Sequence, residues 1–248
     1  MAQTGDRDVQ KEVHAIVIVS EMRKLLVLIS GLALSLIAGE SSRQTVTNTE
    51  RISVAAPGTI RFENSFGEID IEGWDQPEIE VTTTKWTDDG YAKVPPSVAQ
   101  RLESVRITTK RDGNDVVIST AYPARNLFTH PWSRRGDVQL AYRIKAPRGS
   151  RLAVDHNHGG MNIVGMTGDI RATVISGEIT LTLAEGPYAI DAKCDLGNVY
   201  SDFEGTGRRR LVFGEQFGSK REQPTRNIYL RMRFGDIVIL KMPAPPSG

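Results

Sequence analysis

A short phrase built around glycine recurs through the C-terminal half of the chain and restricts the fold more than any other feature. Each copy places glycine before a small or acidic residue and then alternates apolar with polar positions. The copies begin at Gly160, Gly168, Gly177, Gly197 and Gly235. A repeat of about 20 residues is typical of stacked units that are each too small to bury an apolar face alone.

The spacing of the glycines indicates how the units follow one another. The intervals between the main glycines are 17, 20 and 38 residues, for Gly160, Gly177, Gly197 and Gly235. The last interval equals about two periods of the repeat. Gly214 or Gly218 falls inside it, which predicts a divergent turn there.

The residues that follow each glycine alternate with a period of two, as in a strand with one buried face. In one copy, Ile179, Leu181 and Leu183 share a side. The same alternation over 190–195 groups Cys194 with apolar residues, so we interpret this cysteine as a buried apolar side chain. Strands this short and evenly spaced disfavour helical crossovers. We expect an all-β fold, specifically a β-solenoid; a β-sandwich stays open because its strands have a similar spacing.

The first half of the ordered region carries the same phrase with one interruption. Strands are expected at 52–54, 59–63, 69–72, 78–84 and 137–145. The interruption over 87–121 predicts one short helix at 98–103 and a hairpin at 106–120. We therefore expect one repetitive domain over 51–242, with a loop at 122–136 and a disordered tail at 243–248.

The N-terminus has the layout of a secretory signal peptide. A basic Met22-Arg23-Lys24 precedes an apolar run over 25–38, which is short for a membrane span. We interpret 22–39 as a cleaved signal peptide and 40–50 as a flexible lead, with 1–21 an upstream misread or a cytoplasmic lead. The protein is then exported to the periplasm, the cell surface or the medium, without a stable span. An uncleaved anchor is the alternative.

The second half of the chain resembles the bacterial putative-adhesin family, a domain of unknown function. The similarity rests on Ala146-Pro147, on Leu152-Ala153-Val154 and on the glycine phrases from Gly160, Gly168 and Gly177. It implies an exported, repetitive all-β protein with a β-helix-like core at the envelope or cell surface. The family pattern is a repeat, so it supplies no catalytic residue. The insertion at 122–136 and the stretch 205–226 depart from it.

Two histidines form the most site-like short motif. His156 and His158 have the spacing that places both side chains on one face of a strand, where two imidazoles can ligate a metal. No second ligand pair, HExxH or CxxC accompanies them. We therefore interpret the motif as a polar turn and expect neither a metal nor a cofactor.

Seven cationic or aromatic side chains make the candidate ligand-contact surface. They are Arg125, Phe128, Trp132, Arg134, Arg135, Arg231 and Arg233. The five in the 125–135 loop can stack on sugars, bind a polyanion, or form a lid over the end of the sheet. The two on the strand share an outward face and can pair instead with acidic neighbours.

The expected function is binding without catalysis. A net charge of +1 argues against a general nucleic-acid binder, and no GxSxG, P-loop or dinucleotide motif occurs. Outward carboxylates, such as Asp70 and Glu178, offer no basis for choosing a catalytic pair. We expect a binding surface for a polysaccharide or protein partner of the envelope or the exterior. The alternatives are a carbohydrate-active enzyme using Asp155, His156, His158 and Arg210 or Arg231, and a self-assembling structural module.

Overall fold

The computed structural model describes residues 45–54, 56–87, 100, 102–122, 138–209, 213–219 and 223–243. All of them belong to one compact unit. The expected signal peptide at 22–39, the segment 1–21, the loop after Tyr122 and the tail from 244 lie outside these residues. Within them, no helix combines the length and the apolar character that crossing a bilayer requires.

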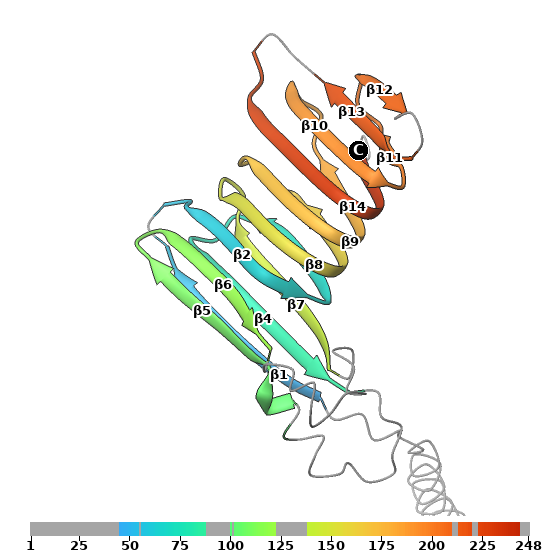
Figure 1. Ribbon diagram of the computed structural model, residues 1–248. Helices are drawn as coiled ribbons and strands as arrows, with labels where there is room; N and C mark the ends of the chain where they lie inside the picture. Colours follow the sequence, from blue (N-terminus) through green and yellow to red (C-terminus); the bar gives the residue numbers. More distant parts are fainter. Residues whose placement is uncertain are drawn as a thin grey trace, which may run out of the picture. The chain divides into compact units, whose positions relative to one another are not determined.

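The described residues form an all-β fold, which confirms the expected class. Fourteen strands make one mixed sheet that is not closed, with parallel pairs in the middle and antiparallel pairs toward its ends (Figure 1). The strands are β1 (Thr45–Ser53), β2 (Thr59–Phe66), β3 (Glu68–Trp74), β4 (Glu78–Trp86), β5 (Arg106–Asp112), β6 (Asp115–Ala121), β7 (Gln139–Pro147), β8 (Arg151–Val164), β9 (Ile170–Leu183), β10 (Tyr188–Leu196), β11 (Val199–Ser201), β12 (Thr206–Arg209), β13 (Glu215–Ser219) and β14 (Arg226–Lys241).

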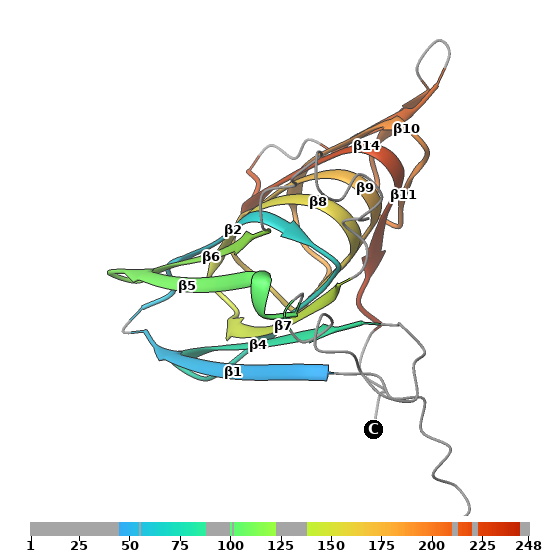
Figure 2. The same cartoon turned by 60° about the horizontal axis from the view of Figure 1, so that its bottom comes forward.

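Three strands are long because they continue through a glycine corner. β8, β9 and β14 have 14, 14 and 16 residues and bend at Gly159, Gly177 and Gly235, whose φ angles are +128°, +144° and +127°. The part of each strand before its glycine lies in one layer of the folded sheet, and the part after it lies in the other (Figure 2). We call these the first and the second layer.

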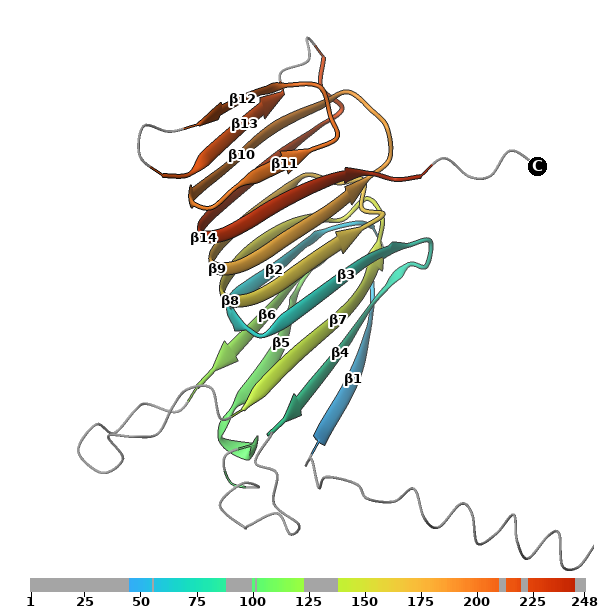
Figure 3. The same cartoon turned by 90° about the vertical axis from the view of Figure 1, so that its right-hand side faces the viewer.

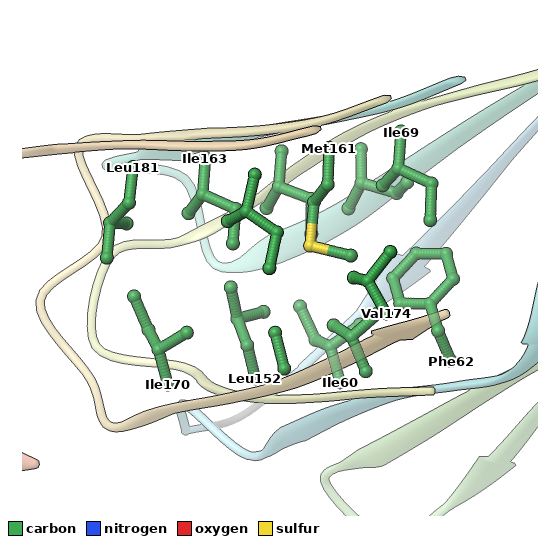
Figure 4. Packing of buried hydrophobic residues seen from close by; sticks show 14 of the residues in the cluster. Ile60, Phe62, Ile69, Leu152, Met161, Ile163, Ile170, Val174 and Leu181 are labelled. Atoms are coloured by element: carbon green, nitrogen blue, oxygen red, sulfur yellow. The ribbon is translucent and has the colours of Figure 1, made fainter. Parts of the chain in front are cut away.

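The core lies between the two layers. Leu152 and Ile170 of the first layer face Ile163 and Leu181 of the second across this space (Figure 4). The period-two pattern is confirmed in detail, since Leu181 and the other predicted inward residues of its strand are fully buried. Each layer alone has one apolar face, and folding at the corners buries both faces together.

Five corner glycines stack directly on one another, and we call them the glycine column. Along the stack they are Gly67, Gly159, Gly177, Gly235 and Gly197. A Cβ atom added at any of the last four would lie 1.8–2.0 Å from the carbonyl oxygen of the preceding glycine. All five have a positive φ. Only glycine combines this backbone conformation with so close a contact.

The order of the stack differs from the order of the chain. The central strands run β8-β9-β14-β10, so β14 lies between β9 and β10 (Figure 3). Gly235 consequently pairs in register with Gly177 and lies against Gly197. The interval from Gly197 to Gly235 therefore does not represent two successive steps of the stack, and that expectation was wrong. β10 and β14 are parallel neighbours, although 29 residues separate the end of one from the start of the other.

Toward β1 and β5, the two layers separate into different strands. β2, β6 and β5 extend the first layer, while β3, β7, β4 and β1 extend the second. The Phe62 and Tyr142 rings meet edge to face across the core, with centroids 6.1 Å apart. The buried Tyr142 hydroxyl is 2.6 Å from Thr120 Oγ1, which satisfies both hydroxyls in a site where an unpaired one would be costly.

The interrupted region matches the expected elements where it is described. β5 and β6 form the predicted hairpin, with a turn at Gly113. Residues 100 and 102–104 are helical, and Lys85 Nζ donates hydrogen bonds to the Leu102 and Val105 carbonyls at the helix end. The flexible lead expected at 40–50 is wrong for 45–50, because these residues belong to β1 and pair with β4.

Candidate functional site

A row of side chains follows the outside of the glycine corner, because the residue before each column glycine lies on the outer side of the bend, and Phe213 likewise precedes Gly214. At one end of the row, Tyr122 packs beside Phe66 and is partly buried against the core. We call this row the corner row. It runs in the order Tyr122, Phe66, His158, Ser176, Phe234, Leu196 and Phe213. The strand register pairs Phe66 with His158, His158 with Ser176, Ser176 with Phe234, and Phe234 with Leu196.

The two ends of the row are set by contacts beyond these pairs. The Tyr122 ring meets the Phe66 ring at 4.8 Å, and the His158 ring lies 6.0 Å from Phe66 on the other side. At the far end, Gly214 lies against Asp195. A Cβ atom added at Gly214 would be 2.4 Å from the Asp195 carbonyl oxygen. This contact places Phe213 beside Leu196.

The corner row exposes apolar surface that most proteins bury. Phe213, Phe234 and Leu196 are 68%, 44% and 40% exposed, and His158 is exposed as well. The bend explains this exposure, since a strand that turns inward around the core carries the residue before the glycine on its outer side. Phe234, Leu196 and Phe213 form an exposed apolar patch at one end of the row, whereas Phe66 and Tyr122 are partly buried and His158 and Ser176 are polar. An exposed apolar patch on a rigid element is a common mark of a binding site.

Carboxylates lie beside the corner row, on the other side of the glycine column. Glu68, Glu178 and Asp236 each follow a column glycine, and Glu178 and Asp236 pair in register. We call these three the carboxylate row. The intervening strand has Gly160 at this position, and the Glu68 side chain fills the space there, with its Oε2 accepting a hydrogen bond from Gly160 N at 3.1 Å.

Each carboxylate of this row is oriented by a hydrogen bond to one of its oxygens. Glu178 Oε1 accepts from Thr180 Oγ1 at 2.9 Å, and Asp236 Oδ1 accepts from the backbone and side-chain nitrogens of Asn198 at 2.8 and 3.0 Å. Among the described residues, no lysine, arginine or histidine forms an ion pair with these three carboxylates. The row therefore offers fixed acceptor oxygens and uncompensated negative charge.

The two candidate metal-binding histidines do not share an environment. His156 is 2% exposed, whereas His158 belongs to the exposed corner row. The corner at Gly159 explains the difference, because His158 lies directly before the bend and on its outer side, whereas His156 points into the core. Within the described ranges, no group of three or more His, Cys, Asp or Glu side chains is arranged to hold a metal ion.

Buried His156 has an unusual environment. Its Nδ1 is 2.9 Å from Ser65 Oγ, while its Nε2 has no hydrogen-bond partner among the residues that the structure describes. Burial away from water lowers the pKa of His156 to about 4, and the nearby His158 contributes to the lowering; the Gly159, Gly67 and His158 carbonyls oppose it. The imidazole is therefore neutral at pH 7 and packs as part of the core.

The expected ligand-contact surface is only partly within the described residues. Arg125, Phe128, Trp132, Arg134 and Arg135 lie outside them. Arg231 forms a 2.6 Å ion pair with Asp191 and lies 3.7 Å from the Tyr229 ring centroid. Arg233 is exposed. The interpretation that this strand's cations pair with acidic neighbours is therefore confirmed for Arg231.

The residues named for a carbohydrate-active enzyme do not converge. Asp155 and Arg231 lie on the outer face of the first layer, each paired with Thr173 between them, whereas the His156 side chain points into the core. Arg210 lies outside the described residues. Cys194 is fully buried, as predicted, and its Sγ donates to the Gly235 carbonyl. Burial raises the pKa of this thiol.

A repeat that begins at glycine does not reveal the corner row, because the row residues stand one position before it. One position earlier, three copies read Phe-Gly followed by a carboxylic acid: Phe66-Gly67-Glu68, Phe213-Gly214-Glu215 and Phe234-Gly235-Asp236. Two others read Ser176-Gly177-Glu178 and Leu196-Gly197-Asn198. The recurrence of an aromatic residue before a corner glycine is the signal that could have identified the row.

Comparisons with known proteins give structural similarity only. No family model matches the chain, and no curated protein matches its sequence. The structure is similar to a putative cell adhesion protein from Clostridium sporogenes, with 12% identity, a TM-score of 0.47 and coverage of 80% of this chain and 100% of the other. A putative adhesin from Bacteroides fragilis (12% identity, TM-score 0.24) covers 79% and 97%. A putative lipid binding protein from Parabacteroides distasonis (9%, 0.22) covers 79% and 97%.

Proposed function

We propose that this chain is an exported, non-catalytic, adhesin-like protein whose β-solenoid-like stack presents a binding surface at the cell envelope or outside the cell. The observation that supports it is the corner row, in which the exposed Leu196, Phe234 and Phe213 form an apolar patch beside oriented carboxylates. An exposed apolar patch costs solubility, so a partner that covers it provides the best explanation.

The scaffold suits a binding role because its surface is fixed before a partner arrives. Each central position of the corner row is held by backbone pairing to the strands on both sides. The glycine column leaves no room for the strands to shift past one another. A preorganised surface loses little conformational entropy on binding, which favours affinity.

Binding to cell envelopes tests the proposed surface. With the purified full-length chain, we expect Phe213→Ser/Phe234→Ser to lower binding to isolated bacterial envelopes by about tenfold, since aromatic anchors dominate interface energies. Tyr200→Ser is the matched control, because Tyr200 is 59% exposed but lies on β11, away from the corner row. Equal binding by all three proteins in a sedimentation assay would remove the corner row from the proposal.

Export is expected from the apolar run at 25–38. The full-length chain produced in bacteria should accumulate outside the cytoplasm, and Leu28→Arg/Leu32→Arg should retain it in the cytoplasm, because charge within the apolar region prevents signal recognition. The control Val17→Arg/Val19→Arg changes the upstream segment and should leave export intact. Cell fractionation measures both, and retention of the unmodified chain in the cytoplasm would contradict export.

A further inference from the structure

We infer that the corner row binds a linear glycan of pyranose units without anionic groups, lying across the strands parallel to the glycine column. This inference rests on the proposed function and names the partner class for the same surface. It is carried by three features of the site: the spacing of the row, the pairing of apolar with acceptor groups, and the sign of the local charge.

The spacing of the corner row follows from the sheet. The row has one residue on each of five adjacent strands, β2, β8, β9, β14 and β10, and Tyr122 and Phe213 lie at its two ends, outside β6 and β13. Neighbouring strands lie about 4.8 Å apart, so the five strand positions extend over roughly 19 Å. One pyranose unit of a linear chain advances by nearly the same length as one strand spacing. Successive sugar rings can therefore meet successive positions of the row.

An extended peptide fits this spacing poorly. Its side chains on one side recur about every 6.7 Å, since each residue rises by about 3.3 Å. Such a peptide laid across the strands would lose register with the corner row after one or two contacts. The repeat distance therefore favours the glycan over the peptide.

The paired rows match the two kinds of surface that a pyranose presents. The C–H face of a sugar ring packs on aromatic rings such as Phe66 and Phe234, while its hydroxyls need acceptors at the ring edge. The carboxylate row supplies them. The second oxygens of Glu68, Glu178 and Asp236 have no hydrogen-bond partner among the described residues, while the first oxygen of each carboxylate is held by the protein.

The charge of the carboxylate row decides between glycan classes. Three carboxylates without a described cationic partner repel uronate, sulfate and phosphate groups, since like charges placed together at an interface are unfavourable. Hydroxyls are compatible with the row, and the ammonium group of an amino sugar is attracted to it. Neutral and amino-bearing glycans are therefore the expected ligands.

Calorimetric titration of the purified full-length chain tests the inference with three hexamers: N-acetylglucosamine, glucosamine and guluronate. The first two should bind and the guluronate hexamer should not. Affinity for N-acetylglucosamine should rise at least about tenfold from dimer to hexamer, because a longer chain covers more of the row. Phe213→Ser/Phe234→Ser should lower the hexamer affinity at least about tenfold, as for loss of interface anchors, whereas Tyr200→Ser should not.

A second pair of variants tests the carboxylate row. Glu178→Gln should weaken binding of the glucosamine hexamer more than that of the N-acetylglucosamine hexamer, because it removes charge and keeps an acceptor oxygen. Glu72→Gln is the matched control, since Glu72 is also exposed but lies five residues beyond Gly67, away from the corner. Equal effects of the two variants would contradict the role of the row.

The outcomes separate this inference from the proposed function. Envelope binding that depends on Phe213 and Phe234, without binding of any hexamer, would overturn the assignment of a glycan ligand and leave the proposed binding role standing. Binding of an oligolysine peptide in place of the hexamers would assign the row to an extended cationic peptide. Failure of both envelopes and hexamers to bind would overturn both proposals. Preference for the guluronate hexamer would contradict the charge argument.

Discussion

Gly177→Ala is expected to destabilise the protein by at least about 3 kcal/mol, because two costs add. Gly177 has a φ of +144°, a conformation that alanine rarely adopts. An added Cβ atom would also lie 1.9 Å from the Gly159 carbonyl oxygen. Neither strand can move away, since β9 is paired on both sides, with β8 and β14. Urea unfolding followed by circular dichroism measures the loss.

Two other glycines allow the cost of backbone strain and the cost of the steric clash to be measured separately. Gly113 also has a positive φ but no atom lies within 4 Å of an added Cβ, so Gly113→Ala should cost about 1 kcal/mol from backbone strain alone. Gly207 has open space and no unusual φ, and Gly207→Ala should be nearly neutral. If Gly177→Ala costs no more than Gly113→Ala, the close stacking of the glycine column is not a structural constraint.

His156 is expected to make stability depend on pH between about 6.5 and 4. Its pKa is about 4 in the folded protein, against 6.5 for the ordinary group. Below pH 6.5 the unfolded chain binds a proton that the folded chain still excludes, so stability is complete above pH 6.5 and falls as the pH approaches 4. A difference of 2.5 pH units corresponds to about 3 kcal/mol.

His156→Val isolates this effect from other titrations. Val174 occupies the equivalent position on β9, so valine fits this part of the core and should change stability by less than about 1.5 kcal/mol at pH 7. From pH 7 to pH 4, the variant should gain about 3 kcal/mol relative to the unmodified protein. Parallel stability profiles of the unmodified protein and His156→Val would contradict a buried neutral imidazole.

The local structure was predictable because two simple signals agree. Alternation with a period of two identified the inward residues, such as Ile179 and Leu181, without knowledge of the partner strands. Glycines before small or acidic residues marked the corners. The hairpin of β5 and β6 was equally clear from its turn residues. These features depend on residues close together in the chain.

The order of the strands could not be predicted, since each strand carries nearly the same pattern. Residues 170–183, 188–197 and 226–241 all present apolar residues at alternate positions and a glycine at the bend. Any of them fits beside any other with the glycines in register. The sequence distance between Gly197 and Gly235 was therefore taken for a distance along the stack, although the two glycines are neighbours.

The candidate site was mostly missed for a different reason. Phe66 and Phe234 are large and apolar, and such residues are usually buried, so their outward position depends on the bend at the following glycine. The bend at Gly159 likewise leaves His158 on the outside while His156 is buried, although strict alternation places both on one face. Arg231 was recognised as outward-facing, but its pairing with Asp191 depends on β14 lying beside β10.

The position of β14 has a consequence for how the chain acquires its structure. β14 pairs with β9 through Ile228–Lys241 and with β10 through Arg226–Phe234, yet it is the last of the described strands to be synthesised. Until it arrives, β9 and β10 each present an open edge toward the empty place between them. Such edges favour pairing with other chains, and the pairing required is distant in sequence and hence slow. The nascent polypeptide therefore cannot complete the centre of its sheet before residues 226–241 have left the ribosome.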